Sequence, residues 1–175
     1  RHCILIDTCV GCHKSYAEPP EWHQRRNEAW LRNLETAGVH PEDVDYVFCT
    51  HLHADHVGWN TKRADGEWVP TFPKAEYLFA EKEYAYWRAE YDKNPPEPLL
   101  YGAFEDSVLP VVAAGQATMV AGDHRVEAGI YLEPAYGHTP GNVMVHVEDG
   151  GDHAIVCGDA IHHPVQLAHP EWSTN

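Results

Sequence analysis

The stretch Thr50-His-Leu-His-Ala-Asp-His-Val-Gly58 places four side chains that can bind metals within six residues: His51, His53, Asp55 and His56. It directly follows an apolar run, residues 44–49, that is typical of a β-strand. In an extended segment, residues two apart project to the same side, so His51 and His53 can share one ion. Asp55 and His56 follow as the chain turns and can serve a second ion. Imidazole and carboxylate suit zinc, and also iron or manganese, so the stretch predicts two divalent metal ions, with zinc favoured.

Two later loops supply the partners that this stretch needs to complete two metal sites. His138 lies in Tyr-Gly-His-Thr-Pro-Gly-Asn, residues 136–142, between strand-like runs at residues 130–132 and 143–147. Asp159 lies in Cys-Gly-Asp-Ala, directly after the apolar run of residues 154–157. Loops at strand ends commonly display binding residues on a rigid scaffold, and glycine lets the backbone pass close to an ion. We therefore expect His138 and Asp159 to join the first four residues.

These three motifs, in this order, resemble the metallo-β-lactamase superfamily of binuclear metal hydrolases, and the resemblance covers essentially the whole chain. It implies that His51, His53 and His138 hold the first metal. It further implies that Asp55 and His56 hold the second metal, with Asp159 bridging the two. The fold implied is the αββα sandwich of that family, an α+β architecture.

The end of the chain departs from the family pattern, which has one further second-site histidine well downstream of the bridging aspartate. Only sixteen residues follow Asp159, and their histidines, at 162, 163 and 169, lie too close to it to match. The chain also starts at Arg1 without a methionine and runs straight into the apolar stretch Cys3–Ile6. We therefore expect residues 1–175 to be a single partial domain, truncated before Arg1 and after Asn175. A complete mononuclear protein is the alternative.

Composition narrows the function classes. The formal charge is −15, and the twelve basic residues form no cluster, which argues against a nucleic-acid partner and favours a small-molecule substrate. No apolar run approaches the roughly twenty residues that would span a bilayer, so no membrane partner is expected. Five cysteines, an odd number, favour a reducing compartment and hence the cytoplasm, although a signal peptide would have been lost with the native amino terminus. Whether the protein forms a homodimer is left open by the sequence.

The remaining elements fit a mixed fold. Apolar spacing predicts a helix from about Pro20 to Ala37, packed on a sheet, and a strand over Glu76–Ala80. Residues 66–70 are typical of a turn and an edge strand. Tyr84, Trp87 and Tyr91 share one helical face, residues 94–98 break that helix, and residues 104–114 are a further helix candidate. From Thr118 onward the chain turns to β structure, with residues 148–152 as a hairpin turn.

Asp7, after the first strand, is placed to accept a hydrogen bond from a ligand imidazole.

The predicted ligands imply hydrolysis of an ester, lactone, amide or phosphoester bond, because two neighbouring metals bring the pKa of a shared water toward neutrality. Asp159 fixes the metal spacing, and Asp55 is placed to accept a proton. The sequence looks most like the lactonase and methyl-parathion-hydrolase-like group. Acyl-homoserine lactonases carry a tyrosine three residues after the bridging aspartate, where this chain has His162, so we expect His162 to donate a hydrogen bond to the substrate oxygen.

We expect a metal-dependent hydrolase that cleaves an ester or lactone bond of a small, fairly apolar substrate. Trp59, Trp68 and Phe72 are either an apolar wall over the metals or packing residues. Three alternatives remain: a hydrolase of organophosphate triesters, a thioesterase like glyoxalase II, and an iron-dependent thiol dioxygenase. The dioxygenase would bind one iron through His51, His53 and His138.

Overall fold

A parallel four-stranded sheet forms the centre of the molecule. The computed structural model describes residues 2–16 and 18–172, so the expected limits Arg1 and Asn175 lie outside the described residues. The sheet has the strand order β1-β2-β5-β6 and is formed by β1 (Ile4–Ile6), β2 (Tyr46–Cys49), β5 (Glu76–Ala80) and β6 (Ala117–Val120). Parallel strands need crossover connections, and these carry the helices. The strands expected near residues 3–6, 46–49 and 76–80 are confirmed.

A second, antiparallel sheet packs against the first. Its order is β10-β9-β8-β7, and its strands are β7 (Arg125–Glu127), β8 (Ile130–Pro134), β9 (Val143–Asp149) and β10 (Asp152–Val156). Gly150 and Gly151 form the turn between β9 and β10, as expected, and both have positive φ angles, which glycine adopts without strain. The long loop between β8 and β9 contains His138.

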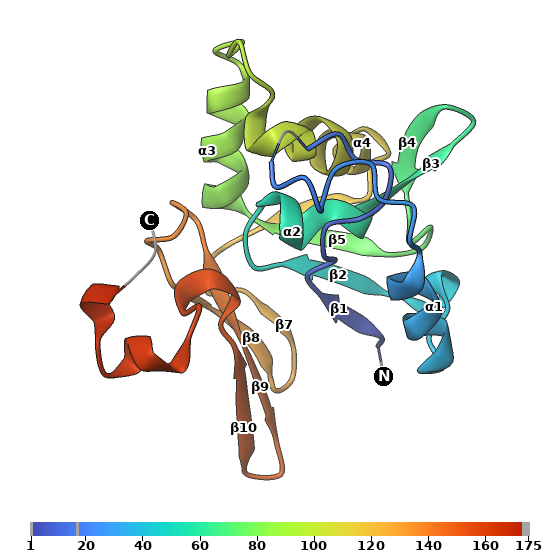
Figure 1. The fold of residues 1–175 in the computed structure, drawn as a ribbon. Coiled ribbons are helices and arrows are strands. Elements are labelled where there is room, and N and C mark those ends of the chain that lie inside the picture. The colour runs from blue at the N-terminus through green and yellow to red at the C-terminus, as the bar shows by residue number, and fades with distance from the viewer. Residues whose placement is uncertain (1, 17, 173–175) are drawn as a thin grey trace.

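Alternation along the central strands divides the interior into two clusters. Val47, Cys49, Tyr77 and Phe79 point to one face and join a core with residues of the helical layer such as Phe104 and Val111. Phe48, Leu78 and Ala80 point to the other face, where they meet Leu132, Val143 and Val145 of the second sheet. The period of two along a strand produces this separation. Figure 1 shows the resulting layers, with α2, α3 and α4 above the parallel sheet and β7–β10 below it.

The outer face of the second sheet is open to solvent in the described part of the chain. Glu133, Glu148 and Ile155 lie on that face, and every residue of β10 is exposed. In the described residues the structure therefore has a helix layer and two packed sheets, which confirms the expected mixed α and β fold. Among the described residues, no helix combines the length and the apolar character that crossing a membrane requires.

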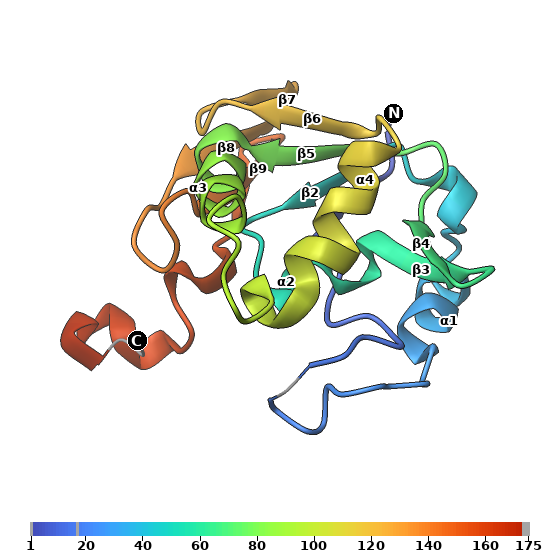
Figure 2. The ribbon, with the colours of Figure 1, turned by 90° about the horizontal axis from the view of Figure 1, so that it is seen from above.

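The helices are shorter than the sequence predicts. They are α1 (Ala29–Thr36), α2 (Ala54–Val57), α3 (Glu81–Tyr91) and α4 (Leu109–Ala113), the last preceded by a π-helical turn, Phe104–Val108. The predicted helix from Pro20 to Ala37 is wrong over its first half. The main-chain N–H of Gln24 donates to the carbonyl of Lys14 instead of to a carbonyl four residues earlier, so residues 20–28 form turns. In Figure 2 this connection, drawn in blue, forms a long loop below α1 and α2.

A small hairpin stands apart from both sheets. It joins β3 (Thr61–Ala64) to β4 (Glu67–Pro70), with Asp65 and Gly66 in the turn. The turn and the strand predicted at residues 66–70 are confirmed, but the strand pairs with β3 rather than at the edge of a main sheet. All five cysteines are described and none of them forms a disulfide.

Candidate metal centre

The predicted metal ligands converge from both sheets. His51 and His53 directly follow β2, and His53 is the residue before α2, which carries Asp55 and His56. His138 comes from the loop between β8 and β9, and Asp159 and His162 follow β10. Because the two sheets pack face to face, the loops at this end of their strands meet. The fold thus brings together residues that are more than a hundred positions apart in the sequence.

Three overlapping groups in the described part of the chain have ligand atoms close enough to share an ion. They are His51, His53 and His138; His51, His56 and Asp159; and His138, Asp159 and His162, with all atoms of a group within 4.8 Å of one another. In the first group, His138 Nε2 lies 2.9 Å from His53 Nδ1. The carboxylate of Asp159 joins the groups, with Oδ1 at 3.3 Å from His56 Nε2 and Oδ2 at 3.4 Å from His138 Nε2.

The imidazole of His51 is the strongest sign that these residues suit a metal. Its side chain is fully buried, yet its Nε2 has no hydrogen-bond partner among the described residues and lies 3.9 Å from Asp159 Oδ2. Buried polar atoms are normally paired, and an unpaired one costs free energy. A nitrogen lone pair directed at other imidazoles and a carboxylate is the arrangement that a divalent cation satisfies. The residues present therefore fit the metal that the donor set implies.

Hydrogen bonds to Asp7 fix the orientation of two of the histidines. Asp7 Oδ2 is 2.9 Å from His56 Nδ1, which confirms the expected contact between this carboxylate and a ligand imidazole. The Thr50 hydroxyl donates to the same oxygen at 2.9 Å, so the hydroxyl oxygen is left to accept from His51 Nδ1 at 3.2 Å. We therefore assign the Nδ1–H tautomer to His51 and His56, which directs both Nε2 atoms toward Asp159.

A glycine allows this close packing. A Cβ on Gly158 would lie 2.6 Å from the hydroxyl oxygen of Thr50, and its φ angle of +51° is in the left-handed region. Glycine is therefore required directly before Asp159. The result is that Asp159 can approach the loop that follows β2.

The electrostatics keep the first group of histidines neutral. Burial and the neighbouring imidazoles lower the pKa of His53 to about 4 and hold that of His51 still lower. Burial also lowers the pKa of His138. Burial acts against the charged form of His56 too, but the hydrogen bond and charge of Asp7 outweigh it and raise the pKa of this residue. Neutral imidazole is the form that binds a metal.

Asp55 and His162 lie beside this cluster in different ways. Asp55 Oδ2 is 3.6 Å from His56 Nε2, but Asp55 belongs to none of the three groups and its carboxylate borders the adjoining cavity. His162 Nε2 is 3.2 Å from Asp159 Oδ2, and His162 is a member of the third group.

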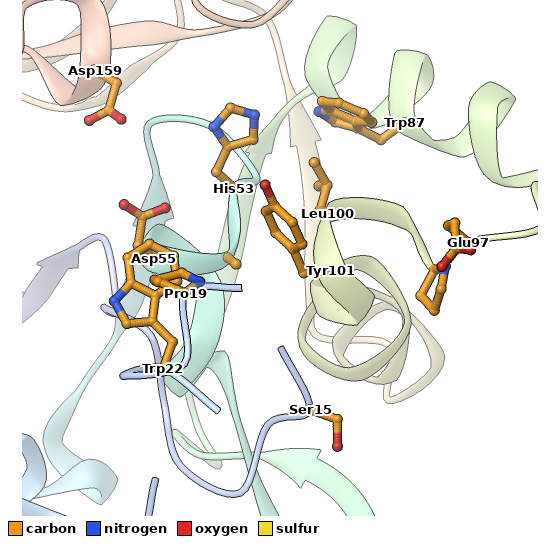
Figure 3. A pocket seen from close by; sticks show the side chains of 12 residues that line it. Ser15, Pro19, Trp22, His53, Asp55, Trp87, Glu97, Leu100, Tyr101 and Asp159 are labelled. Atoms are coloured by element: carbon orange, nitrogen blue, oxygen red, sulfur yellow. The ribbon is translucent and has the colours of Figure 1, made fainter. Parts of the chain in front are cut away.

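A cavity of about 740 Å³ opens onto the cluster (Figure 3). His53, Asp55 and Asp159 lie on one side of it, and the remaining wall is largely apolar, with Trp22, Trp87 and Tyr101 as its large side chains. This wall comes from the long loop before α1 and from α3 with the segment after it. The sequence did not point to Trp22 or Tyr101, because Trp22 falls within the stretch that was predicted as a helix and Tyr101 lies in no motif.

The aromatic residues suggested as a wall have other roles. Trp59 is buried and stacks on Trp30, with ring centroids 6.1 Å apart, and Phe72 is fully buried in the core. The ring of Trp68 packs under the ammonium of Lys14 at 3.6 Å. None of the three borders the 740 Å³ cavity, so they are packing residues.

Comparison with known proteins agrees with this architecture. A family model described as the metallo-beta-lactamase superfamily matches residues 1–171. An N-acyl homoserine lactonase of Bacillus cereus is 30% identical over 115 residues, which are 66% of this chain and 37% of that protein. The chain thus spans little more than a third of the length of the curated relatives it matches.

Solved structures show the same fold. The structure of hydrolase AbOPH, in the beta lactamase superfamily, superposes with a TM-score of 0.70 at 26% identity, covering 96% of this chain and 56% of that one. The dizinc quorum-quenching lactonase AidC superposes with a TM-score of 0.71 at 21% identity, covering 97% of this chain and 56% of its own. With the family model matching nearly every residue, the chain belongs to the metallo-beta-lactamase superfamily.

Proposed function

We propose that this protein is a metal-dependent hydrolase that cleaves the ester or lactone bond of a small, apolar substrate. One observation carries the proposal: a largely apolar cavity ends on a cluster of imidazoles and carboxylates that can hold metal ions. His51, His53 and His138 would hold one ion, and Asp55 and His56 a second, with Asp159 between them. Zinc is the first choice, with iron or manganese as alternatives. Several of the similar proteins are named as lactonases, which supports ester or lactone hydrolysis as the reaction class.

The chain's own residues divide the work of the reaction. When bound, the ions would supply an activated water near neutral pH and polarise the bond under attack. Asp55 borders the cavity beside the cluster, where its carboxylate can accept the proton released by the attacking water. His162, next to Asp159, can donate a hydrogen bond to a substrate oxygen, either the leaving-group oxygen or the one on which negative charge develops. The buried side of the cluster, around His51, excludes bulk water.

The wall of the cavity selects for uncharged substrates. Glu97 borders the cavity and would repel an anionic ligand there, whereas the charges of Asp55 and Asp159 would be offset by the ions that they hold. Trp22, Trp87 and Tyr101 offer flat apolar surface for an acyl chain or an aryl group. A neutral lactone or ester with an apolar substituent fits both properties.

An organophosphate triester is the second candidate, because it is also uncharged and bulky. The same cavity would bind its ester groups, and the same ligands would serve its hydrolysis. A glyoxalase II-like thioesterase and an iron-dependent thiol dioxygenase are less well supported, since neither explains the apolar wall. The dioxygenase would need one iron held by His51, His53 and His138 only.

The test is a substrate panel measured on the zinc-loaded protein. An N-acyl homoserine lactone, an aryl ester and a diethyl aryl phosphotriester are incubated with it before and after chelation. We expect turnover of the lactone or the aryl ester that chelation abolishes and zinc restores. Preference for the phosphotriester would favour the second candidate, and turnover that survives complete removal of metal would refute the proposal.

We also propose that residues 1–175 belong to one domain, that the protein works in the cytoplasm, and that nucleic acid is not a partner. The two core clusters use alternate residues of the same strands, β2 and β5, which supports one domain. The net charge of −15 supports the last point.

A further inference from the structure

A buried carboxylate lies behind the metal centre. Glu83, in the first turn of α3, is only 1% exposed. Burying a charged group costs free energy unless it is well paired. Four hydrogen bonds offset this free energy here, which points to a specific role for this carboxylate.

The two oxygens of Glu83 receive donors from three segments. Oε1 accepts from the main-chain N–H of Leu52 at 3.2 Å and from the indole N–H of Trp87 at 2.7 Å. Oε2 accepts from the hydroxyl of Thr139 at 2.7 Å and from the main-chain N–H of Gly141 at 2.9 Å. Hydrogen bonds to an ionised acceptor are stronger than neutral ones.

Two of these donors are immediate neighbours in the sequence of three proposed metal ligands. Leu52 stands between His51 and His53, and Thr139 follows His138. One carboxylate therefore ties together the two loops whose histidines form the first ligand group. The loop that carries His138 also approaches α3 closely: a Cβ on Gly141 would lie 2.2 Å from the main-chain nitrogen of Glu83.

The same carboxylate also reaches the substrate cavity. Trp87, which donates to Oε1, borders the cavity, and its ring centroid lies 6.1 Å from that of His53. The position of this wall residue is thus linked to the position of the ligand loop. No pattern in the sequence indicates this role, since Glu83 lies among exposed charged residues on α3.

We propose that Glu83 is a positioning residue that sets the spacing of His51 and His53 relative to His138, and so the metal affinity of that group. The inference rests on the proposed metal site. Glutamine at this position has the same shape but only one acceptor oxygen, and its NH2 group would face donors. Glu83→Gln should therefore loosen the link between the loops without leaving a cavity.

The experiment measures zinc affinity on the metal-free protein by competition with a chromophoric chelator. We expect Glu83→Gln to weaken binding by about 10- to 100-fold, the usual effect of losing a residue that orients ligands. Thr139→Val, which removes one donor to Oε2, should give a smaller loss. Trp87→Phe, which keeps an aromatic ring but loses the indole N–H, should change KM more than it changes zinc affinity. Glu81→Gln, an exposed position in the same turn of α3, should match the wild type.

Thermal unfolding of the metal-free variants separates positioning from stability alone. If Glu83→Gln lowers Tm but leaves zinc affinity unchanged, Glu83 is merely structural and the inference is overturned while the proposed function stands. A wild-type protein that binds no zinc would overturn both. Weakened affinity in Glu83→Gln, with Glu81→Gln unaffected, supports the assignment.

Discussion

The metal centre and the cavity wall beside it are built in opposite ways. The centre uses loops at strand ends, and its histidines are held by Asp7, Thr50 and each other at distances near 3 Å. The wall uses long irregular connections: Trp22 lies in the loop before α1, and Tyr101 is 55% exposed. Leu100 and Tyr101 both have φ angles above +50°, in the left-handed region. The proposed metal ligands are therefore fixed by the sheets, while the proposed substrate wall lies largely on irregular segments, where sequence changes are usually tolerated.

Because the centre and the wall are built differently, a substitution at His51 in the centre should affect all substrates alike. His51→Ala should lower kcat/KM for every substrate in the panel by about three orders of magnitude or more, because the water would lose its activation. The measurement is kcat/KM together with metal content. His40→Ala, which changes an exposed histidine far from the cluster, is the control and should behave like the wild type. Loss of activity on only some substrates would show that His51 belongs to the wall's function instead.

Asp7 should produce an intermediate effect that is also the same for all substrates. Asp7→Asn keeps the shape but removes the charge that orients His56, so we expect metal affinity to fall by about 10- to 100-fold. Asp65→Asn is a matched control, because Asp65 is exposed and has a similar left-handed backbone, with φ of 50° against 59° for Asp7. Equal zinc affinity in the two variants would contradict the role given to Asp7.

The wall should respond differently from the centre. Trp22→Ala and Tyr101→Ala should raise KM for long-chain lactones by about tenfold, since each removes apolar contact area, and should leave kcat and metal content unchanged. The measurement is a series of acyl-chain lengths, in which the effect should grow with length. Trp172→Ala, an exposed tryptophan outside the cavity, should have no effect. A fall in kcat without a change in KM would mean that these residues act on the chemistry.

Lys14 should have the smallest effect on activity and a measurable one on stability. Its side chain is fully buried, donates to Thr61 and Asp106, and anchors the loop that carries the wall. Burial lowers its pKa from 10.5 to about 8. Between these two pH values the unfolded chain holds the proton and the folded chain does not, so this group makes the free energy of unfolding rise with pH.

Denaturant titrations from pH 7.5 to 10.5 check this contribution. Measured against Lys14→Met, the wild type should gain on the order of 3 kcal/mol at most over this range, because buried thiols and phenols with raised pKa, such as Cys49 and Tyr77, affect both proteins alike. Lys62→Met, an exposed lysine on β3, should keep it. Parallel curves for wild type and Lys14→Met would show that Lys14 keeps its ordinary pKa in the fold.

The same contrast explains what the sequence could predict. The donors at 51, 53, 56, 138 and 159 were identifiable because metal chemistry demands particular side chains at short spacings near strand ends. The contact between Asp7 and His56 followed from the same logic. No comparable rule exists for Trp22 or Tyr101, whose positions depend on the path of irregular loops. Trp59 and Phe72 show the converse: they are near the motif in sequence, but the strand and turn that follow bury them in the core.

Fold prediction failed where tertiary contacts replaced local ones. Strands at residues 4–6, 46–49 and 76–80 follow their apolar patterns, and the helix at residues 81–91 ends where prolines approach. The stretch before α1 has helical spacing, but His13 and Gln24 donate main-chain hydrogen bonds across a loop to Arg25 and Lys14. Such pairing cannot be read from periodicity.

The measurement that tests the central claim most directly is the metal content of the purified protein, by mass spectrometry, beside that of His51→Ala and Asp159→Ala. We predict about two zinc-type ions per chain in the wild type and clear loss in both variants, because His51 would hold one of the ions and Asp159 would contribute to both. A metal-free wild type, or variants with unchanged metal content, would contradict the account.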